Sequence, residues 1–130
     1  MGINDVTAVI VDAAMQIHKD IGAGLLESVY EAILAKKLEK RGLLVERQKI
    51  LRFEYDGMVF EEGFRMDLLV EDQVVVELKS VDQTAPVHKK QLLTYLKLAK
   101  KPVGLLINFG SATLKEGITR VINAPADSLQ

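Results

Sequence analysis

Two acidic residues on either side of a predicted tight turn, Asp67 and Glu77, have a spacing that suits metal binding. Between them lie Glu71-Asp72-Gln73, and the second acid opens a charged motif, Glu77-x-Lys79, after an apolar run. A three-residue hairpin loop would place Asp67 opposite Glu77, with Cβ atoms roughly 5 Å apart, whereas a two-residue loop would turn Asp67 to the other face. Carboxylates this close repel each other and raise one pKa unless a cation lies between them. We therefore interpret both as ligands of a hard divalent cation.

The same residues also have a simpler explanation. Glu77 and Lys79 are two apart in a strand and so point to one face, where they could form an ion pair without any metal. In a chain that is 27% charged, an acid followed at some distance by Glu-x-Lys also occurs by chance. From these residues alone, both interpretations stay open.

The elements that must hold the two acids follow from hydrophobic spacing and turn residues. The run 74–78 is almost entirely aliphatic, as in a strand covered on both faces, and Asp56-Gly57 is a strong hairpin signal. The expected strands are 43–55, 58–70 with a kink at Gly63, 74–79, 103–109 and an edge strand at 118–122. The expected helices are one capped by Asn4 or Asp5 and ended by Gly22, one at 25–41 followed by Gly42, and one from Pro86 to about residue 100. Because 103–109 follows a helix, we expect it to pair parallel to a neighbour, which gives an α/β fold with a mixed β-sheet flanked by helices.

Length and composition narrow the possibilities. A chain of 130 residues is expected to form one domain, here 1–124, with a loose tail at 125–130. There is no cysteine, so any metal must be held by oxygen or by His18 and His88. Neither histidine has a second ligand at zinc-binding spacing, and we expect both to support the structure.

The net charge of the chain is −1, so its overall charge does not indicate a polyanionic partner. Basic residues nevertheless gather at 36–52 and 89–101, and acidic ones at 54–72; solvated element faces explain these clusters equally well. No stretch is long and apolar enough to span a membrane, and the first residues lack the features of a targeting signal. The expected location is cytoplasmic, with no membrane partner.

The order of the motifs resembles that of the PD-(D/E)xK nucleases. Glu27 falls in a helix, Asp67 and Glu77-x-Lys79 follow on strands, and Gln91-x-x-x-Tyr95 lies on the next helix, which is similar to the RecB-like branch. Gly24-x-x-Glu27-x-x-Tyr30 also resembles the GxxExxY family within that superfamily, over nearly the whole chain. Met66 stands before Asp67 where the superfamily name has proline, at a tolerant position.

This resemblance implies a restriction-endonuclease-like α-β-β-β-α-β core with an extra N-terminal helix. It implies a nuclease that depends on Mg²⁺ or Mn²⁺ and acts on nucleic acid, in particular DNA, in repair or in defence. It also implies that the metal is held by Asp67, Glu77, the Leu78 carbonyl and Glu27. Lys79 would orient the attacking water or balance the charge of the phosphate. Gln91 and Tyr95 would brace the site or contact the phosphate backbone.

Other functions fit the same residues. A simpler role for Glu27 is that of an acid in the first turn of a helix, where the helix dipole favours a negative charge. A simpler role for Tyr95 is that of a half-buried ring with Gln91 as its hydrogen-bond partner. A catalytically silent module that binds nucleic acid or protein is one alternative. A subunit that is active only in a homodimer or beside a larger protein partner is another.

Overall fold

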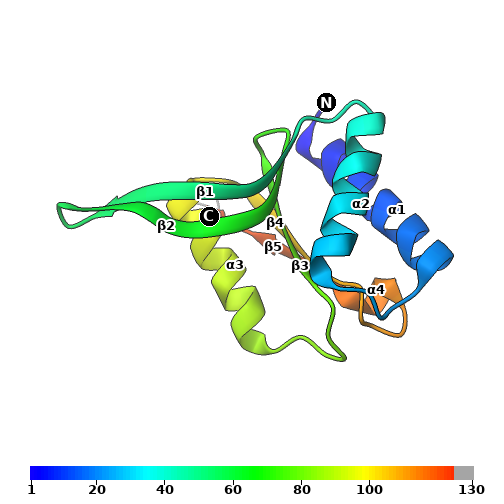
Figure 1. The fold of residues 1–130 in the computed structure, drawn as a ribbon. Helices are drawn as coiled ribbons and strands as arrows, with labels where there is room; N and C mark the ends of the chain where they lie inside the picture. The colour runs from blue at the N-terminus through cyan, green and yellow to red at the C-terminus, as the bar shows by residue number, and fades with distance from the viewer. Residues whose placement is uncertain (125–130) are drawn as a thin grey trace.

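The structure, a computed structural model, describes residues 1–124 and has a mixed sheet between two helical layers (Figure 1). The helices are α1 (Ile3–Ile21), α2 (Glu27–Lys40), α3 (Pro86–Ala99) and the short α4 (Leu114–Gly117). The strands are β1 (Val45–Tyr55), β2 (Met58–Val70), β3 (Val74–Lys79), β4 (Val103–Asn108) and β5 (Ile118–Ile122). They lie side by side in chain order; β3 and β4 are parallel, and the other neighbours are antiparallel. The predicted α/β class and the parallel crossover through α3 are confirmed.

Each face of the sheet has its own apolar core. Val74, Val76 and Leu78 of β3 pack toward α1 and α2, whereas Val75 packs toward Leu92 and Leu96 of α3. Both faces of β3 are therefore covered, which explains its continuous aliphatic run. Because side chains alternate along a strand, Glu77 emerges on the same side as Val75, toward α3.

The hairpin between β2 and β3 has the predicted three-residue loop, since Val70 pairs with Val74. The backbone register continues through Leu69 with Val75 to Leu68 with Val76, and the next facing residues are Asp67 and Glu77. The predicted opposition of these two acids is thus supported by the strand register.

The β1–β2 hairpin extends beyond the helical layers (Figure 1). Asp56 and Gly57 form its turn, both with positive φ, as the Asp-Gly pair predicts. The register shifts between Leu51–Phe64 and Phe53–Phe60, in agreement with the kink expected near Gly63. A side chain at Gly63 would begin 2.2 Å from the Phe53 ring, so the aromatic ring lies directly over this glycine.

Some predicted boundaries were wrong. The first helix begins at Ile3 with Gly2 as its N-cap, so Asn4 and Asp5 lie inside the first turn. Asp5 still caps from there, because its carboxylate accepts a hydrogen bond from the Gly2 N–H at 3.2 Å. The short helix α4 was not expected, since its four residues carry no hydrophobic periodicity. The predicted tail, 125–130, lies outside the described residues.

Candidate metal-binding site

Asp67 and Glu77 meet where β2 separates from β3. The backbone N–H of Asp67 donates a hydrogen bond to Glu77 Oε1 at 3.2 Å, and the N–H of Leu78 donates one to Asp67 Oδ2 at 2.8 Å. Side chains thus take over the pairing of the two strands after the backbone ladder ends at Leu68 and Val76. This pairing fixes both carboxylates at one point between the strands.

The electrostatics of this pair are unfavourable without a cation. Burial, together with the negative charge of Asp67, raises the pKa of Glu77 to about 8. The positive charge of Lys79, two residues along the same strand face, opposes this shift without cancelling it. A divalent cation between the carboxylates would relieve both the burial cost and the repulsion.

Leu78 offers a third oxygen on the same side. Its N–H points toward β2, as the bond to Asp67 shows, whereas the carbonyl of Lys79 points toward β4 and accepts from the Phe109 N–H at 2.9 Å. Because the N–H and C=O of one strand residue point to the same side, the Leu78 carbonyl is directed toward β2, beyond the end of the ladder. It is therefore positioned near the carboxylate pair.

The donor set fits a hard cation. Within residues 1–124, no group of three or more His, Asp or Glu side chains is close enough to hold a metal ion. The available donors are two carboxylates and a carbonyl. Mg²⁺ is typically held by one or two carboxylates, with water and substrate phosphate completing its shell, so Asp67, Glu77 and Leu78 match Mg²⁺ or Mn²⁺ better than Zn²⁺.

Tyr95 of α3 faces this pair. Its ring stacks on Phe64 of β2 with centroids 4.3 Å apart and planes inclined by 15°. Burial raises the pKa of Tyr95, and the negative charges of Glu77 and Asp67 act in the same direction. Gln91 lies one helical turn earlier, is exposed, and makes no hydrogen bond to Tyr95 in the described structure.

Glu27 does not join the pair. It is the first residue of α2, is exposed, and lines a shallow pocket with Leu25 and Ser80, beside the end of β3. No hydrogen bond within residues 1–124 connects Glu27 to Asp67 or Glu77. Its proposed ligand role therefore stays a prediction.

A different acid of α2, Glu31, is connected to the site. Its buried carboxylate accepts hydrogen bonds from Arg47 at 3.1 Å and from the amide of Gln48, both on β1. The same Gln48 amide donates to Asp67 Oδ1 at 3.4 Å. Gln48 has a left-handed backbone with φ of 50°, unusual for a residue other than glycine, which marks a local irregularity in β1 opposite Asp67.

The position of Glu31 in the sequence indicates that its side chain is buried, although Glu31 belongs to none of the motifs. Glu31 lies three and seven residues before Leu34 and Leu38, on the stripe of α2 that packs inward. A carboxylate on an apolar stripe is buried only when it is paired, so its position alone predicts polar partners.

The two histidines make structural contacts. His18 Nε2 lies 3.1 Å from the carbonyl oxygen of Ser111, which connects α1 to the segment after β4. His88 Nδ1 accepts a hydrogen bond from the Ala85 N–H at 3.1 Å, at the start of α3.

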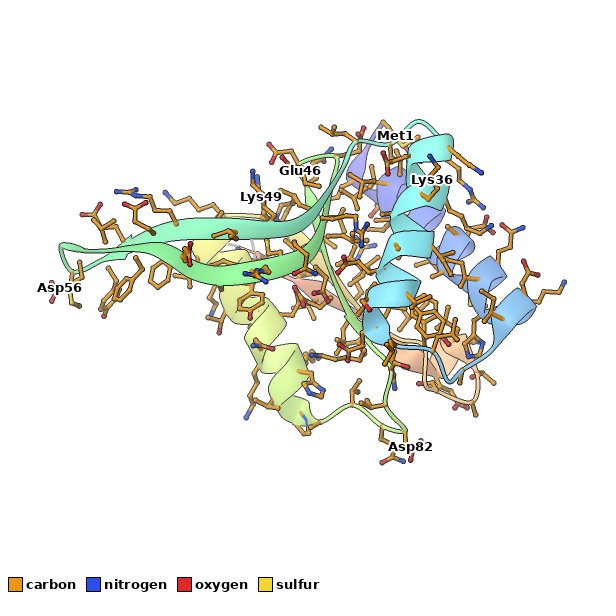
Figure 2. The ribbon with its side chains drawn as sticks, in the orientation of Figure 1. Met1, Lys36, Glu46, Lys49, Asp56 and Asp82 are labelled. Atoms are coloured by element: carbon orange, nitrogen blue, oxygen red, sulfur yellow. The ribbon has the colours of Figure 1, made fainter. Side chains whose placement is uncertain are left out.

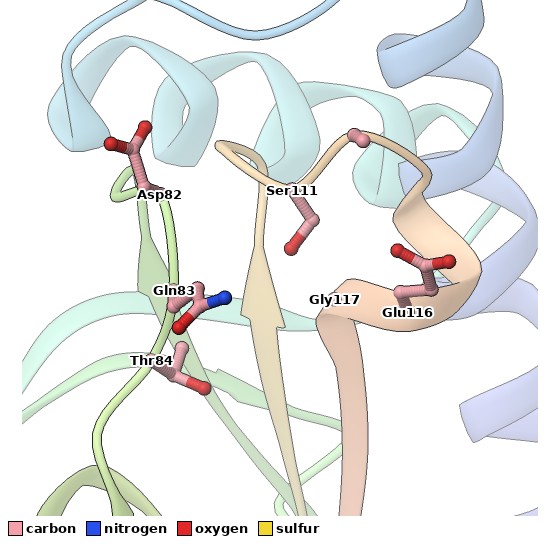
Figure 3. A pocket seen from close by; sticks show the side chains of 7 residues that line it. Asp82, Gln83, Thr84, Ser111, Glu116 and Gly117 are labelled. Atoms are coloured by element: carbon pink, nitrogen blue, oxygen red, sulfur yellow. The ribbon is translucent and has the colours of Figure 1, made fainter.

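A separate polar pocket lies between the loop after β3 and the segment joining β4 to α4. It encloses about 390 Å³, and Gln83 and Ser111 lie on its facing loops (Figure 3). None of the predicted site residues line it. Beneath it the buried side chain of Asn108 accepts from the N–H groups of Val81 and Gly110 and donates to the carbonyl of Val81 and the hydroxyl of Ser111. Asn108 therefore fixes the loop that leaves β3.

Comparisons with known proteins agree with this fold. The family model described as the PD-(D/E)XK nuclease superfamily matches residues 4–121. The chain belongs to this superfamily, and its sheet and helices are consistent with a restriction-endonuclease-like core.

One solved structure extends the comparison at the level of the fold. The crystal structure of SSO0001 is similar to this chain, with a TM-score of 0.52 and 24% sequence identity. The match covers 98% of this chain and 60% of the other, so this chain spans about 60% of the length of that protein. No curated protein matches this sequence. No helix among residues 1–124 is long and apolar enough to cross a membrane.

Proposed function

We propose that this protein is a nuclease that depends on Mg²⁺ or Mn²⁺ and hydrolyses phosphodiester bonds in DNA, in repair or in defence against foreign DNA. The observation that carries this proposal is the meeting of the half-buried Asp67 on β2 with the buried Glu77 near the end of β3, with Lys79 on the same strand face as Glu77. Membership of the nuclease superfamily supports it. The motifs that resemble the GxxExxY family and the RecB-like Gln-x-x-x-Tyr branch support it further.

The carboxylates of Asp67 and Glu77 and the carbonyl of Leu78 would hold the cation. A divalent cation bound there lowers the pKa of water and offsets negative charge on the phosphate. To bind it, Glu77 must give up the proton that its burial favours. The hydrogen bond from the Leu78 N–H keeps Asp67 in place.

The remaining residues act on the substrate or on the ligands. Lys79 contributes positive charge beside the phosphate or orients the attacking water. Tyr95 and Gln91, on successive turns of α3, brace the site or contact the phosphate backbone. Glu27 is proposed to reach the metal from the start of α2 when substrate is bound, and Glu31 holds Asp67 through Gln48.

Cleavage of labelled substrates tests this proposal. Single-stranded, duplex and branched DNA and RNA are incubated with Mg²⁺ or Mn²⁺ and with the wild type, Asp67→Ala or Lys79→Ala. Matched controls are Asp20→Ala and Lys115→Ala, which remove exposed charges outside the site. We expect metal-dependent cleavage of DNA that both site variants lose and both controls retain. If the folded wild type cuts nothing, or the site variants cut equally well, a binding module or a partner-activated subunit replaces this proposal.

A further inference from the structure

The outer part of the β1–β2 hairpin, residues 50–64, forms an arm with an aromatic face. Phe53 and Phe60 stack across the two strands with centroids 5.0 Å apart, and Phe53 lies 6.4 Å from Phe64. Tyr55 and Met58 continue this face to the turn and are 68% and 53% exposed. Large apolar side chains are thus presented to solvent along the arm.

Such an arm gains stability from a partner. A two-stranded hairpin without a packed face is only marginally stable in water, and clustered exposed aromatic residues are typical of protein interfaces. The arm also carries Glu54, Asp56, Glu61 and Glu62 against a single basic residue, Arg52, for a net charge of −3. This charge disfavours nucleic acid and favours a protein surface that is both apolar and basic.

The chain presents a surface of that kind on α2. A groove of about 440 Å³ is lined by Ala32 and Ile33 together with three lysines, Lys36, Lys37 and Lys40. Lys36 and Lys40 are exposed and form no ion pair within the described residues. Because the groove combines apolar and basic side chains, it complements the acidic aromatic arm in both respects.

One molecule cannot make this contact with itself. The arm projects away from α1 and α2, and Asp56 at its tip lies on the opposite side of the molecule from Lys36 (Figure 2). The arm that reaches the groove must therefore belong to another copy.

We propose that the arm of one copy docks into the α2 groove of a second copy of this chain. Tyr55, Met58 and Phe60 cover Ala32 and Ile33, and the carboxylates of the arm pair with the lysines of the groove. The contact is independent of the metal site, so it stands or falls separately from the proposed nuclease activity.

Sedimentation equilibrium at several protein concentrations tests this contact. We expect the wild type to reach at least twice the 14.4 kDa of one chain as its concentration rises. The double variants Tyr55→Ser/Phe60→Ser and Lys36→Glu/Lys40→Glu should remain at the mass of one chain. Val87→Ser, which removes an exposed apolar side chain on α3, and Asp67→Ala should associate like the wild type. Circular dichroism verifies that each variant is folded.

A charge exchange tests the pairing itself. Glu54→Lys/Glu62→Lys should abolish association alone and regain it when combined in one chain with Lys36→Glu/Lys40→Glu. A wild type that stays at the mass of one chain, or association that survives both the arm and the groove variants, would overturn the proposal. A folded combined variant that fails to associate would exclude these lysines as the partners of the arm.

Discussion

The carboxyl groups of Asp67 and Glu77 replace backbone hydrogen bonding at the point where β2 and β3 diverge. The N–H of Asp67 donates to Glu77 Oε1, and Asp67 Oδ2 in turn accepts from the next residue of β3, Leu78. The strands are thus joined there by two acids that repel each other when both are charged. A site of this kind costs stability in the free protein, and a bound cation would relieve that cost.

The raised pKa of Glu77 predicts how stability depends on pH. The folded state holds the Glu77 proton up to a pKa of about 8, whereas the unfolded chain loses it near the ordinary value of 4.5. Between these values the folded state binds more protons, so the free energy of unfolding falls as pH rises, by an amount on the order of a few kcal/mol. Urea unfolding at pH 5, 6.5 and 8 in the presence of a chelator measures this slope. Glu77→Gln should flatten it, and an unchanged slope in that variant would contradict the assignment.

Removing the charge of Asp67 should stabilise the protein. Asp67→Asn keeps an oxygen that accepts from the Leu78 N–H but no longer repels Glu77. We expect a gain of about 1 kcal/mol near pH 8, with loss of metal binding, as is common where a site is strained for function. Thermal unfolding without metal checks the gain. The control Asp72→Asn, at an exposed residue paired with Lys101, should show no such gain; equal behaviour of the two variants would count against the repulsion.

Loss of Glu31 should lower both the stability of the protein and its affinity for Mn²⁺, although Glu31 lies outside the motifs. Glu31→Ala leaves the Gln48 amide without its main acceptor and frees the Gln48 side chain, which contacts Asp67. We predict a loss of about 1–3 kcal/mol in stability together with weaker binding of Mn²⁺. Glu39→Ala, at an exposed position of the same helix, is the matched control. Chemical unfolding and calorimetric titration test both effects, and a loss of stability with unchanged Mn²⁺ affinity would limit Glu31 to a structural role.

Asn108 should be the most sensitive polar residue beneath the loop after β3. Asn108→Ala removes all four hydrogen bonds of its side chain and leaves the Val81 and Gly110 N–H groups without an acceptor, at a cost of about 2–4 kcal/mol. Ser111→Ala removes one of these bonds and should cost about 1 kcal/mol or less. Urea unfolding distinguishes the two; equal losses would indicate that the network is not centred on Asn108.

Much of the fold could be predicted from sequence because its signals are local. The Asp-Gly turn, the glycines after α1 and α2, Pro86 at the start of α3 and the aliphatic run of β3 each determine an element from a few neighbouring residues. The opposition of Asp67 and Glu77 could also be predicted from the sequence, because it depends only on the length of one hairpin loop.

The rest of the site depends on contacts between residues far apart in the chain. Glu31 reaches Asp67 through Gln48, whose left-handed backbone is set by the packing of β1 against α2 and β2 rather than by its own preference. Asn108 forms hydrogen bonds with a loop almost thirty residues earlier in the sequence. No spacing rule along the sequence reveals such contacts.

Calorimetric titration of the metal-free protein with Mn²⁺ tests the central claim most directly, because it does not require knowledge of the substrate. We predict one site in the wild type, tighter at pH 8 than at pH 6 because Glu77 must lose its proton, and loss of binding in both Asp67→Asn and Glu77→Gln. Undiminished binding in these variants, or no binding by the folded wild type at either pH, would contradict the assignment of Asp67 and Glu77 as metal ligands.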